Sequence, residues 1–347
     1  MSLVDTFIQL SERGLMPDFL IRAGIRNLCK KRLAQCRVDD CEANAELAEE
    51  YLRKVDQSAL AVETDKANEQ HYEVPAEFYH LVLGKNLKYS CCCYEPGTRG
   101  LDQAEDLALE LTCQRADLQD GQDVLELGCG WGALTLWMAK NFPKSRIRSV
   151  SNSNSQREYI MKTAKERGLD NLEVVTSDVN SFEPDQSYDR VVSVEMFEHV
   201  RNHRQLFSKI HDWLNPGGKL FTHVFCHRST SYPFVVEGED DWMSQHFFSG
   251  GTMPADELFL RICGKLELES RWRWSGTHYG ETSEDWLRNL DQNKAAVLQL
   301  FEKDQSREEA NQSFHRWRIF FLACAETFAY ANGQEWWVSH YLFAKQG

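Results

Sequence analysis

The feature that most constrains the fold is a regular alternation of short apolar segments and longer amphipathic segments that begins near residue 104. Strand-like segments occupy residues 123–130, 146–153, 172–178, 188–197 and 219–226, and helix-like segments occupy residues 104–118, 131–142, 155–169 and 203–218. Helices of this length between strands indicate βαβ units, and therefore a mostly parallel sheet with helices on both faces. In such open sheets, ligands bind beyond the carboxyl ends of the strands.

The flanking regions have a different pattern. Residues 1–75 are predicted to form an N-terminal helical segment, because apolar residues recur there at three- and four-residue spacing. After residue 226, two further strand-like segments (266–276 and 335–346) flank a helical stretch at about 283–332. We expect these strands to complete the sheet with an antiparallel edge, and the helical stretch to cap the strand ends. The prediction is a Rossmann-like α/β fold with its core at 76–226 and a C-terminal part at 227–347.

Composition limits the partners and the compartment. A formal net charge of −14 disfavours nucleic acid and suits a neutral or cationic small molecule. No segment approaches the roughly 20 apolar residues of a membrane span, and the first residues lack the pattern of a secretory signal. The 11 scattered cysteines are expected to be reduced thiols. We therefore expect a soluble cytoplasmic protein without a structural metal or stable membrane insertion, and a homodimer is left open.

A glycine-rich turn, Glu126-Leu-Gly-Cys-Gly-Trp-Gly132, joins the first strand to its helix. Gly128, Gly130 and Gly132 allow a sharp turn and a close approach of backbone to ligand. The turn lacks the Gly-Lys-Ser/Thr ending of a phosphate-binding P-loop and the G-x-G-x-x-G spacing of a dinucleotide fingerprint. It fits a nucleoside that carries an amino acid, as in S-adenosylmethionine. A tight turn without any ligand remains the simpler alternative.

The next two strands end in polar residues that could meet the same ligand. Asn152 and Gln156 offer amide hydrogen bonds where a ribose would lie, although they could instead cap the following helix. Asp178, followed by Val179, could accept a hydrogen bond from an adenine amino group, or it could be a solvated loop residue.

The fourth strand runs into the charged segment Ser193-Val-Glu-Met-Phe-Glu-His199. Glu195, Glu198 and His199 can converge only if the strand turns into a helix near Phe197. Two carboxylates and an imidazole suit the binding of an amine and the removal of its proton. The alternative is that these carboxylates only stabilise the N-terminus of the next helix.

With these segments in view, the sequence resembles the coclaurine N-methyltransferase group within the cyclopropane-fatty-acid-synthase-like superfamily. The matching segments include HYEVPAEFYHLVLGKNLKYSCCCY, VLELGCGWG, EMFEHVRNH, HYGETSEDWLRNLD and NGQEWWVSHYLF, and they extend from about residue 12 to 345. The resemblance implies a class I methyltransferase fold and N-methylation of a small amine, which is a benzylisoquinoline in the plant members, with S-adenosylhomocysteine as by-product. It implies cofactor contacts by Tyr89, Ser90, Gly128, Gly130, Asn152, Gln156, Asp178 and Val179, and a catalytic cluster of Glu195, Glu198 and His199.

The same superfamily contains a competing activity. Its lipid-modifying members methylenate an unsaturated acyl chain and hold a bicarbonate-like base with a Cys, Glu, His, Ile and Tyr set. Four positions match that set here (Cys91, Glu198, His223 and Tyr279), whereas Phe225 stands at the isoleucine position and Glu195 replaces a typical glycine. We place His223, Phe225 and Tyr279 in the substrate pocket and favour the amine, because an added carboxylate suits an amine better than an alkene. A protein that binds the cofactor without turnover is a third alternative.

Overall fold

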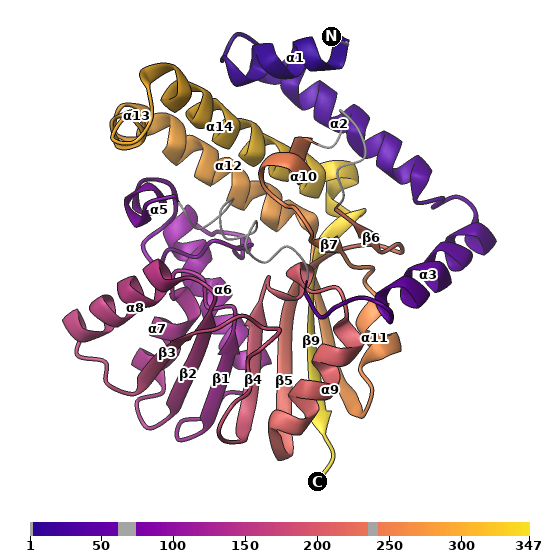
Figure 1. Ribbon diagram of the computed structural model, residues 1–347, viewed down its shortest axis with the longest axis vertical. Coiled ribbons are helices and arrows are strands. Elements are labelled where there is room, and N and C mark those ends of the chain that lie inside the picture. The colour runs from indigo at the N-terminus through magenta and orange to yellow at the C-terminus, as the bar shows by residue number, and fades with distance from the viewer. Residues whose placement is uncertain (1–2, 62–73, 235–241) are drawn as a thin grey trace.

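A mixed sheet forms the centre of the molecule, and the computed structural model describes residues 3–61, 74–234 and 242–347 (Figure 1). The strands of this sheet are β1 (Asp123–Leu127), β2 (Arg146–Ser151), β3 (Leu172–Thr176), β4 (Tyr188–Val194), β5 (Leu214–His227), β8 (Leu266–Trp274) and β9 (Trp336–Lys345). Their order is β3-β2-β1-β4-β5-β9-β8. Strands β1 to β5 are parallel, and β9 lies antiparallel between β5 and β8. The predicted Rossmann-like fold is confirmed.

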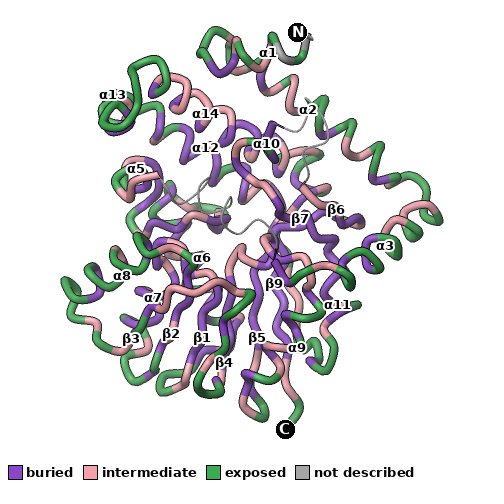
Figure 2. The backbone as a smooth tube through the Cα atoms, viewed as in Figure 1, coloured by how far each residue is buried: buried purple, intermediate pink, exposed green. Residues whose placement is uncertain are grey.

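Helices connect the parallel strands and cover the sheet. They are α6 (Leu101–Arg115) before β1, then α7 (Ala133–Asn141), α8 (Asn154–Glu166) and α9 (His203–Trp213). The central strands are buried on both sides (Figure 2), which explains why their sequences are almost continuously apolar. The strand order reverses direction beside β1, so a crevice is expected between the carboxyl ends of β1 and β4.

A helical cap lies over the carboxyl ends of the strands (Figure 1). It consists of α12 (Gly276–Gln292), α13 (Lys294–Phe301) and α14 (Arg307–Ala329), followed by the short η2 (Tyr330–Gly333). The cap begins at Gly276 and not near residue 283 as predicted. Two glycines, Gly276 and Gly280, weaken the helical pattern at this start, yet close packing needs them. A Cβ at Gly276 would lie 2.1 Å from the Trp336 carbonyl oxygen, and one at Gly280 would lie 3.1 Å from the Ala329 Cβ.

The predicted N-terminal helices α1 (Leu3–Glu12), α2 (Asp18–Gln35) and α3 (Cys41–Val55) are present. Arg22 on α2 ties this segment to the cap, because its guanidinium contacts Glu284 at 2.5 Å and Glu326 at 2.9 Å. No helix in the described ranges is both long and apolar enough to cross a membrane. The remaining short elements are α5 (Ala76–Val82), η1 (Phe197–His199), β6 (Tyr232–Pro233), α10 (Trp242–His246), β7 (Thr252–Met253) and α11 (Leu258–Ile262).

Replacing Gly276 tests how tightly the cap is seated on the sheet. We expect Gly276→Ala to lower the free energy of unfolding by about 3 kcal/mol, because the added methyl group meets backbone carbonyl oxygens that cannot move aside easily. The matched control is Gly24→Ala within α2, where the nearest atom is a Phe7 ring carbon at 3.6 Å. The control should be neutral or stabilising by up to about 1 kcal/mol. Denaturant unfolding measures both, and equal effects would contradict the proposed packing.

Candidate active site

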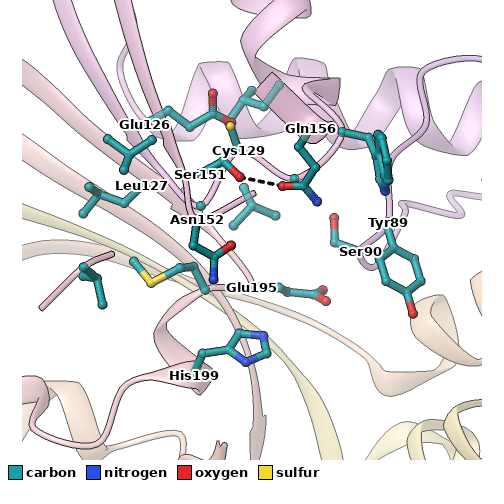
Figure 3. Close-up of a pocket in the computed structure, with 18 of the residues that line it drawn as sticks. Tyr89, Ser90, Glu126, Leu127, Cys129, Ser151, Asn152, Gln156, Glu195 and His199 are labelled. Atoms are coloured by element: carbon teal, nitrogen blue, oxygen red, sulfur yellow. Dashed lines mark hydrogen bonds between the residues drawn. The ribbon is translucent and has the colours of Figure 1, made fainter. Parts of the chain in front are cut away.

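One pocket opens at the carboxyl ends of β1, β2, β3 and β4 (Figure 3). All the residues predicted to contact a cofactor line it: Tyr89, Ser90, Gly128, Gly130, Asn152, Gln156, Asp178 and Val179. Glu195 and His199 line the same pocket, so the structure brings the predicted binding residues and part of the predicted catalytic cluster together.

The glycine turn after β1 forms the floor of this pocket, and its glycines have different tasks. Gly128 and Gly132 have φ values of +80° and +82°, and a Cβ there would meet Met196 at 2.6 Å and Ile160 at 2.5 Å. Gly130 has a φ of +51°, but a Cβ there would have no neighbour within 4 Å. A tight turn without a ligand would account for Gly128 and Gly132. The open space at Gly130 fits the close approach of a ligand.

Polar atoms at the end of β2 are available to a ligand. Ser153 is the N-cap of α8 and its side chain accepts from the backbone N–H of Gln156, so the side chains of Asn152 and Gln156 are not the cap. The Gln156 Oε1 accepts from the Ser151 hydroxyl at 2.7 Å, whereas its Nε2 is buried without a partner among the described residues. The same holds for Trp131 Nε1 in the same pocket. Unpaired buried donors are costly, and the hydroxyl and carboxylate oxygens of S-adenosylmethionine would satisfy them.

The Asp178 carboxylate at the end of β3 is partly engaged in its own loop. It accepts from the backbone N–H of Asn180 at 2.6 Å, and Asn180 in turn accepts from the backbone N–H of Ala61 at 3.0 Å. Asp178 still lines the pocket, so an oxygen of this carboxylate is placed where it could also accept from a ligand.

A buried carboxylate that sequence reasoning missed holds the loop that supplies Tyr89. Glu105 on α6 accepts hydrogen bonds of 2.7 to 3.2 Å from the backbone N–H groups of Gly84, Asn86 and Lys88. Burial raises the pKa of Glu105 to about 7. Its only sequence signal is an acidic residue at an otherwise apolar helical position.

Glu195, directly after β4, contacts residues of three separate segments. Its Oε1 accepts from the Cys91 backbone N–H at 2.8 Å and contacts the His223 Nε2 at 3.1 Å. Its Oε2 accepts from the Tyr279 hydroxyl at 2.7 Å. Burial raises the pKa of Glu195, and the nearby charge of Lys88 and these hydrogen bonds oppose that rise. Lys88 is another residue missed from sequence; its buried ammonium donates to the Ser90 hydroxyl at 2.6 Å.

Glu198 and His199 sit on η1, the predicted turn from strand into helix. Neither Glu195 nor Glu198 caps the next helix, because Asn202 is the N-cap of α9. Glu198 is fully buried behind the pocket, and its Oε1 accepts from the Phe225 backbone N–H at 2.7 Å. Burial and the charge of Glu195 raise the pKa of Glu198 well above its usual value, which favours a neutral acid. Burial lowers the pKa of His199 to about 4, so this imidazole is neutral.

None of the three predicted substrate residues lines the pocket of the glycine turn. His223 and Tyr279 contact Glu195 itself. The Phe225 ring lies 5.7 Å from that of Phe248 and 5.9 Å from that of Phe328, and Tyr279 stacks on Phe328 at 4.2 Å. Tyr279 therefore joins Glu195 to a group of aromatic rings formed by Phe328, Phe225 and Phe248. Burial raises the pKa of the Cys91 thiol far above its usual value, so Cys91 is not a thiolate nucleophile.

Known proteins share this architecture over nearly the whole chain. A family model described as mycolic acid cyclopropane synthetase matches residues 61–336. An (S)-coclaurine N-methyltransferase from Thalictrum flavum subsp. glaucum is 38% identical, covering 96% of this chain and 94% of the relative. A crystal structure of coclaurine N-methyltransferase bound to N-methylheliamine and S-adenosylhomocysteine is 35% identical, covers 99% of each chain and superposes with a TM-score of 0.91.

More distant proteins share the fold alone. A cyclopropane synthase from Mycobacterium tuberculosis is 22% identical, covers 81% of this chain and 98% of its own, and has a TM-score of 0.70. The protein thus belongs to the mycolic acid cyclopropane synthetase family of S-adenosylmethionine-dependent methyltransferases, and within it to the group that resembles coclaurine N-methyltransferase.

Proposed function

We propose that this protein transfers a methyl group from S-adenosylmethionine to the nitrogen of a small aromatic or heterocyclic amine. Relatives named (S)-coclaurine N-methyltransferase and pavine N-methyltransferase, 38% and 32% identical, support an amine acceptor. The observation that carries the proposal is the Glu195 carboxylate, which faces the pocket and is held there by donors from three separate segments.

Lipid cyclopropanation is the competing function, because four residues match the set that holds bicarbonate in the lipid-modifying members. Three of those residues, Cys91, His223 and Tyr279, hydrogen-bond here to Glu195. In this interpretation the Glu195 side chain supplies the carboxylate that the lipid enzymes take from solution. A fixed negative charge beside the pocket favours an amine, whose nitrogen is cationic before it is deprotonated and again once it is methylated.

The cofactor fits the pocket of the glycine turn. We assign its ribose and amino-acid parts to the turn, Gln156, Asn152 and Ser90, and its adenine to the region of Asp178 and Val179. When bound, S-adenosylmethionine supplies an electrophilic methyl group on a sulfonium sulfur. The residues of the chain need only orient the acceptor and manage its proton, because direct in-line transfer requires no covalent enzyme intermediate.

The proton-handling roles follow from the electrostatics. The nitrogen must be neutral to attack, and the neutral His199 imidazole places no positive charge beside the cation that then develops on it. As the new N–C bond forms and the S–C bond breaks, nitrogen becomes cationic, and its proton passes to the Glu195 carboxylate. Glu198 stays neutral behind it. The Phe248 ring, whose centroid lies 4.7 Å from that of His199, could stabilise the cation through its face.

Replacing Gly130 tests the cofactor assignment. We expect Gly130→Ala to weaken binding of S-adenosylhomocysteine at least about tenfold, equivalent to about 1.4 kcal/mol, because the methyl group enters space left open for the ligand. Gly168→Ala is the matched control, since Gly168 also has a positive φ (+67°) with nothing within 4 Å but does not line the pocket. Both variants should lose about 1 kcal/mol of stability. Calorimetric titration that finds unchanged affinity for Gly130→Ala would refute the assignment.

The two glutamates provide an internal comparison. Glu195→Gln should lower kcat at least about a hundredfold, because an amide cannot accept the amine proton. Glu198→Gln should cost much less, since an amide has nearly the shape of the neutral acid that we assign to Glu198. Steady-state kinetics with an accepted amine measures both, and binding of S-adenosylhomocysteine is the control for folding. Equal losses would contradict this division of roles.

Product analysis separates the two functions. The protein is incubated with labelled S-adenosylmethionine and either a panel of benzylisoquinoline and simpler amines or vesicles of unsaturated phospholipid, each with and without bicarbonate. We expect N-methylated amines, at a rate that does not change when bicarbonate is removed. Bicarbonate-dependent modification of the vesicles, with no amine methylated, would establish the lipid function and exclude the proposal.

A further inference from the structure

Two buried histidines connect Glu195 to an arginine on another element. His223 of β5 and His340 of β9 face each other in the strand register, and both are fully buried. Their ring centroids are 4.6 Å apart. Arg115, in the last turn of α6, has its Nη1 2.8 Å from the His340 Nδ1. The contacts therefore run from Arg115 through His340 and His223 to Glu195.

The chemistry of the end groups fixes the tautomer of each ring. A guanidinium only donates, so the His340 Nδ1 is an acceptor and the proton of this ring is on Nε2. An ionised carboxylate only accepts, so the His223 Nε2 carries its proton toward Glu195, and its Nδ1 holds a lone pair. Burial lowers the pKa of both histidines far below the usual value, which favours the neutral rings that this assignment needs.

The two atoms left over are complementary. Among the described residues, the His340 Nε2 and the His223 Nδ1 are both buried without a partner. By the tautomer assignment the first is a donor and the second an acceptor, on adjacent rings. A hydrogen bond between them, direct or through one water, would satisfy both atoms.

The surroundings of Arg115 hold its guanidinium in place for this contact. The group lies over the rings of Trp272 and Trp274, at 5.4 Å and 5.3 Å from their centroids. Trp274 also packs edge-on against His340 at 4.4 Å and against His223 at 5.4 Å. Two tryptophans of the edge strand β8 therefore hold the Arg115 guanidinium beside the histidine pair.

We propose that Arg115 and His340 are positioning residues, which hold His223 in the tautomer that donates to Glu195 and so keep that carboxylate ionised and aimed at the pocket. In the other tautomer, a nitrogen lone pair of His223 would face the carboxylate, and Glu195 would take up a proton to relieve the repulsion. It would then be unable to accept the proton of an amine. The kinetic part of this inference rests on the proposed N-methylation, whereas the tautomer part does not.

Kinetics tests the functional part. His340→Phe keeps a buried ring but removes both nitrogens. We expect kcat for amine methylation to fall roughly tenfold to a hundredfold, with little change in the KM for the amine or for S-adenosylmethionine. His340→Gln should recover much of the activity, because its amide can accept from Arg115 and donate onward. His227→Phe is the matched control, since His227 is also fully buried on β5 and lies beside a β9 ring, that of Trp336 at 5.4 Å. The functional part is overturned if His340→Phe retains the kcat of the control, or if the glutamine variant is no better than phenylalanine.

The pH dependence of kcat provides a second test, because a simple loss of packing would not shift it. The other titratable groups near Glu195 are the same in all these variants: Lys88, Cys91, Cys92, Glu198, His199, Tyr279 and Cys324. We therefore expect the acidic limb of kcat to move to higher pH in His340→Phe, because Glu195 is protonated more easily. An unchanged limb would contradict the inference.

Imidazole ¹⁵N NMR tests the tautomers without any reaction. In the unaltered protein we expect both His223 and His340 to carry their proton on Nε2. The signals of the two rings are assigned by their loss in His223→Phe and in His340→Phe. Arg115→Met should convert His340 to a mixture of tautomers. A proton on Nδ1 of His223 in the unaltered protein overturns the inference. If the tautomers are as expected but no amine is methylated, then the proposed function fails and the tautomer assignment stands.

Discussion

The active site depends on keeping one carboxylate in place after it has been removed from water. An isolated buried charge costs several kcal/mol, and hydrogen bonds to the charged form offset that cost. Glu195 obtains its donors from Cys91 on the loop before α6, His223 on β5 and Tyr279 on α12. These segments are distant in sequence, so the same contacts that keep the carboxylate in place also dock the helical cap onto the sheet. The contacts that hold Glu195 at the candidate site are therefore also contacts between the cap and the sheet.

Each of the strands β1 to β4 contributes the residues after its carboxyl end to the pocket. The turn after β1 and the polar residues after β2 and β3 line one part of it, where we propose that the cofactor binds, and the segment after β4 adds Glu195 and His199. Only the reversal of strand order beside β1 brings these segments to one crevice. A loop held from below by Glu105 closes the arrangement with Tyr89 and Ser90.

Sequence patterns predicted what depends on local periodicity and missed what depends on tertiary contacts. The apolar runs gave β1 to β4 within three residues, because buried parallel strands are apolar throughout. The start of β5 at Leu214 was missed, because its first residues, Leu-Asn-Pro-Gly-Gly, were assigned to the end of the preceding helix. The start of α12 was missed, because Gly276 is required by packing against Trp336 and not by helix propensity. Glu195 and Glu198 look alike in sequence, and only their tertiary contacts distinguish them. His340 could not be singled out, because its place beside His223 depends on the register of β5 with β9.

The position of β9 has a consequence for how the chain is made. This strand lies between β5 and β8, yet Trp336 pairs with His227, 109 residues earlier (336 − 227). Until β9 has been synthesised, β5 leaves unpaired backbone groups along one side and β8 along both, and such open strand edges invite association with other chains. The intervening cap helices make mainly local contacts and can form earlier. A nascent chain of this family would therefore be most vulnerable to aggregation late in translation, and chaperone binding during that interval would protect it.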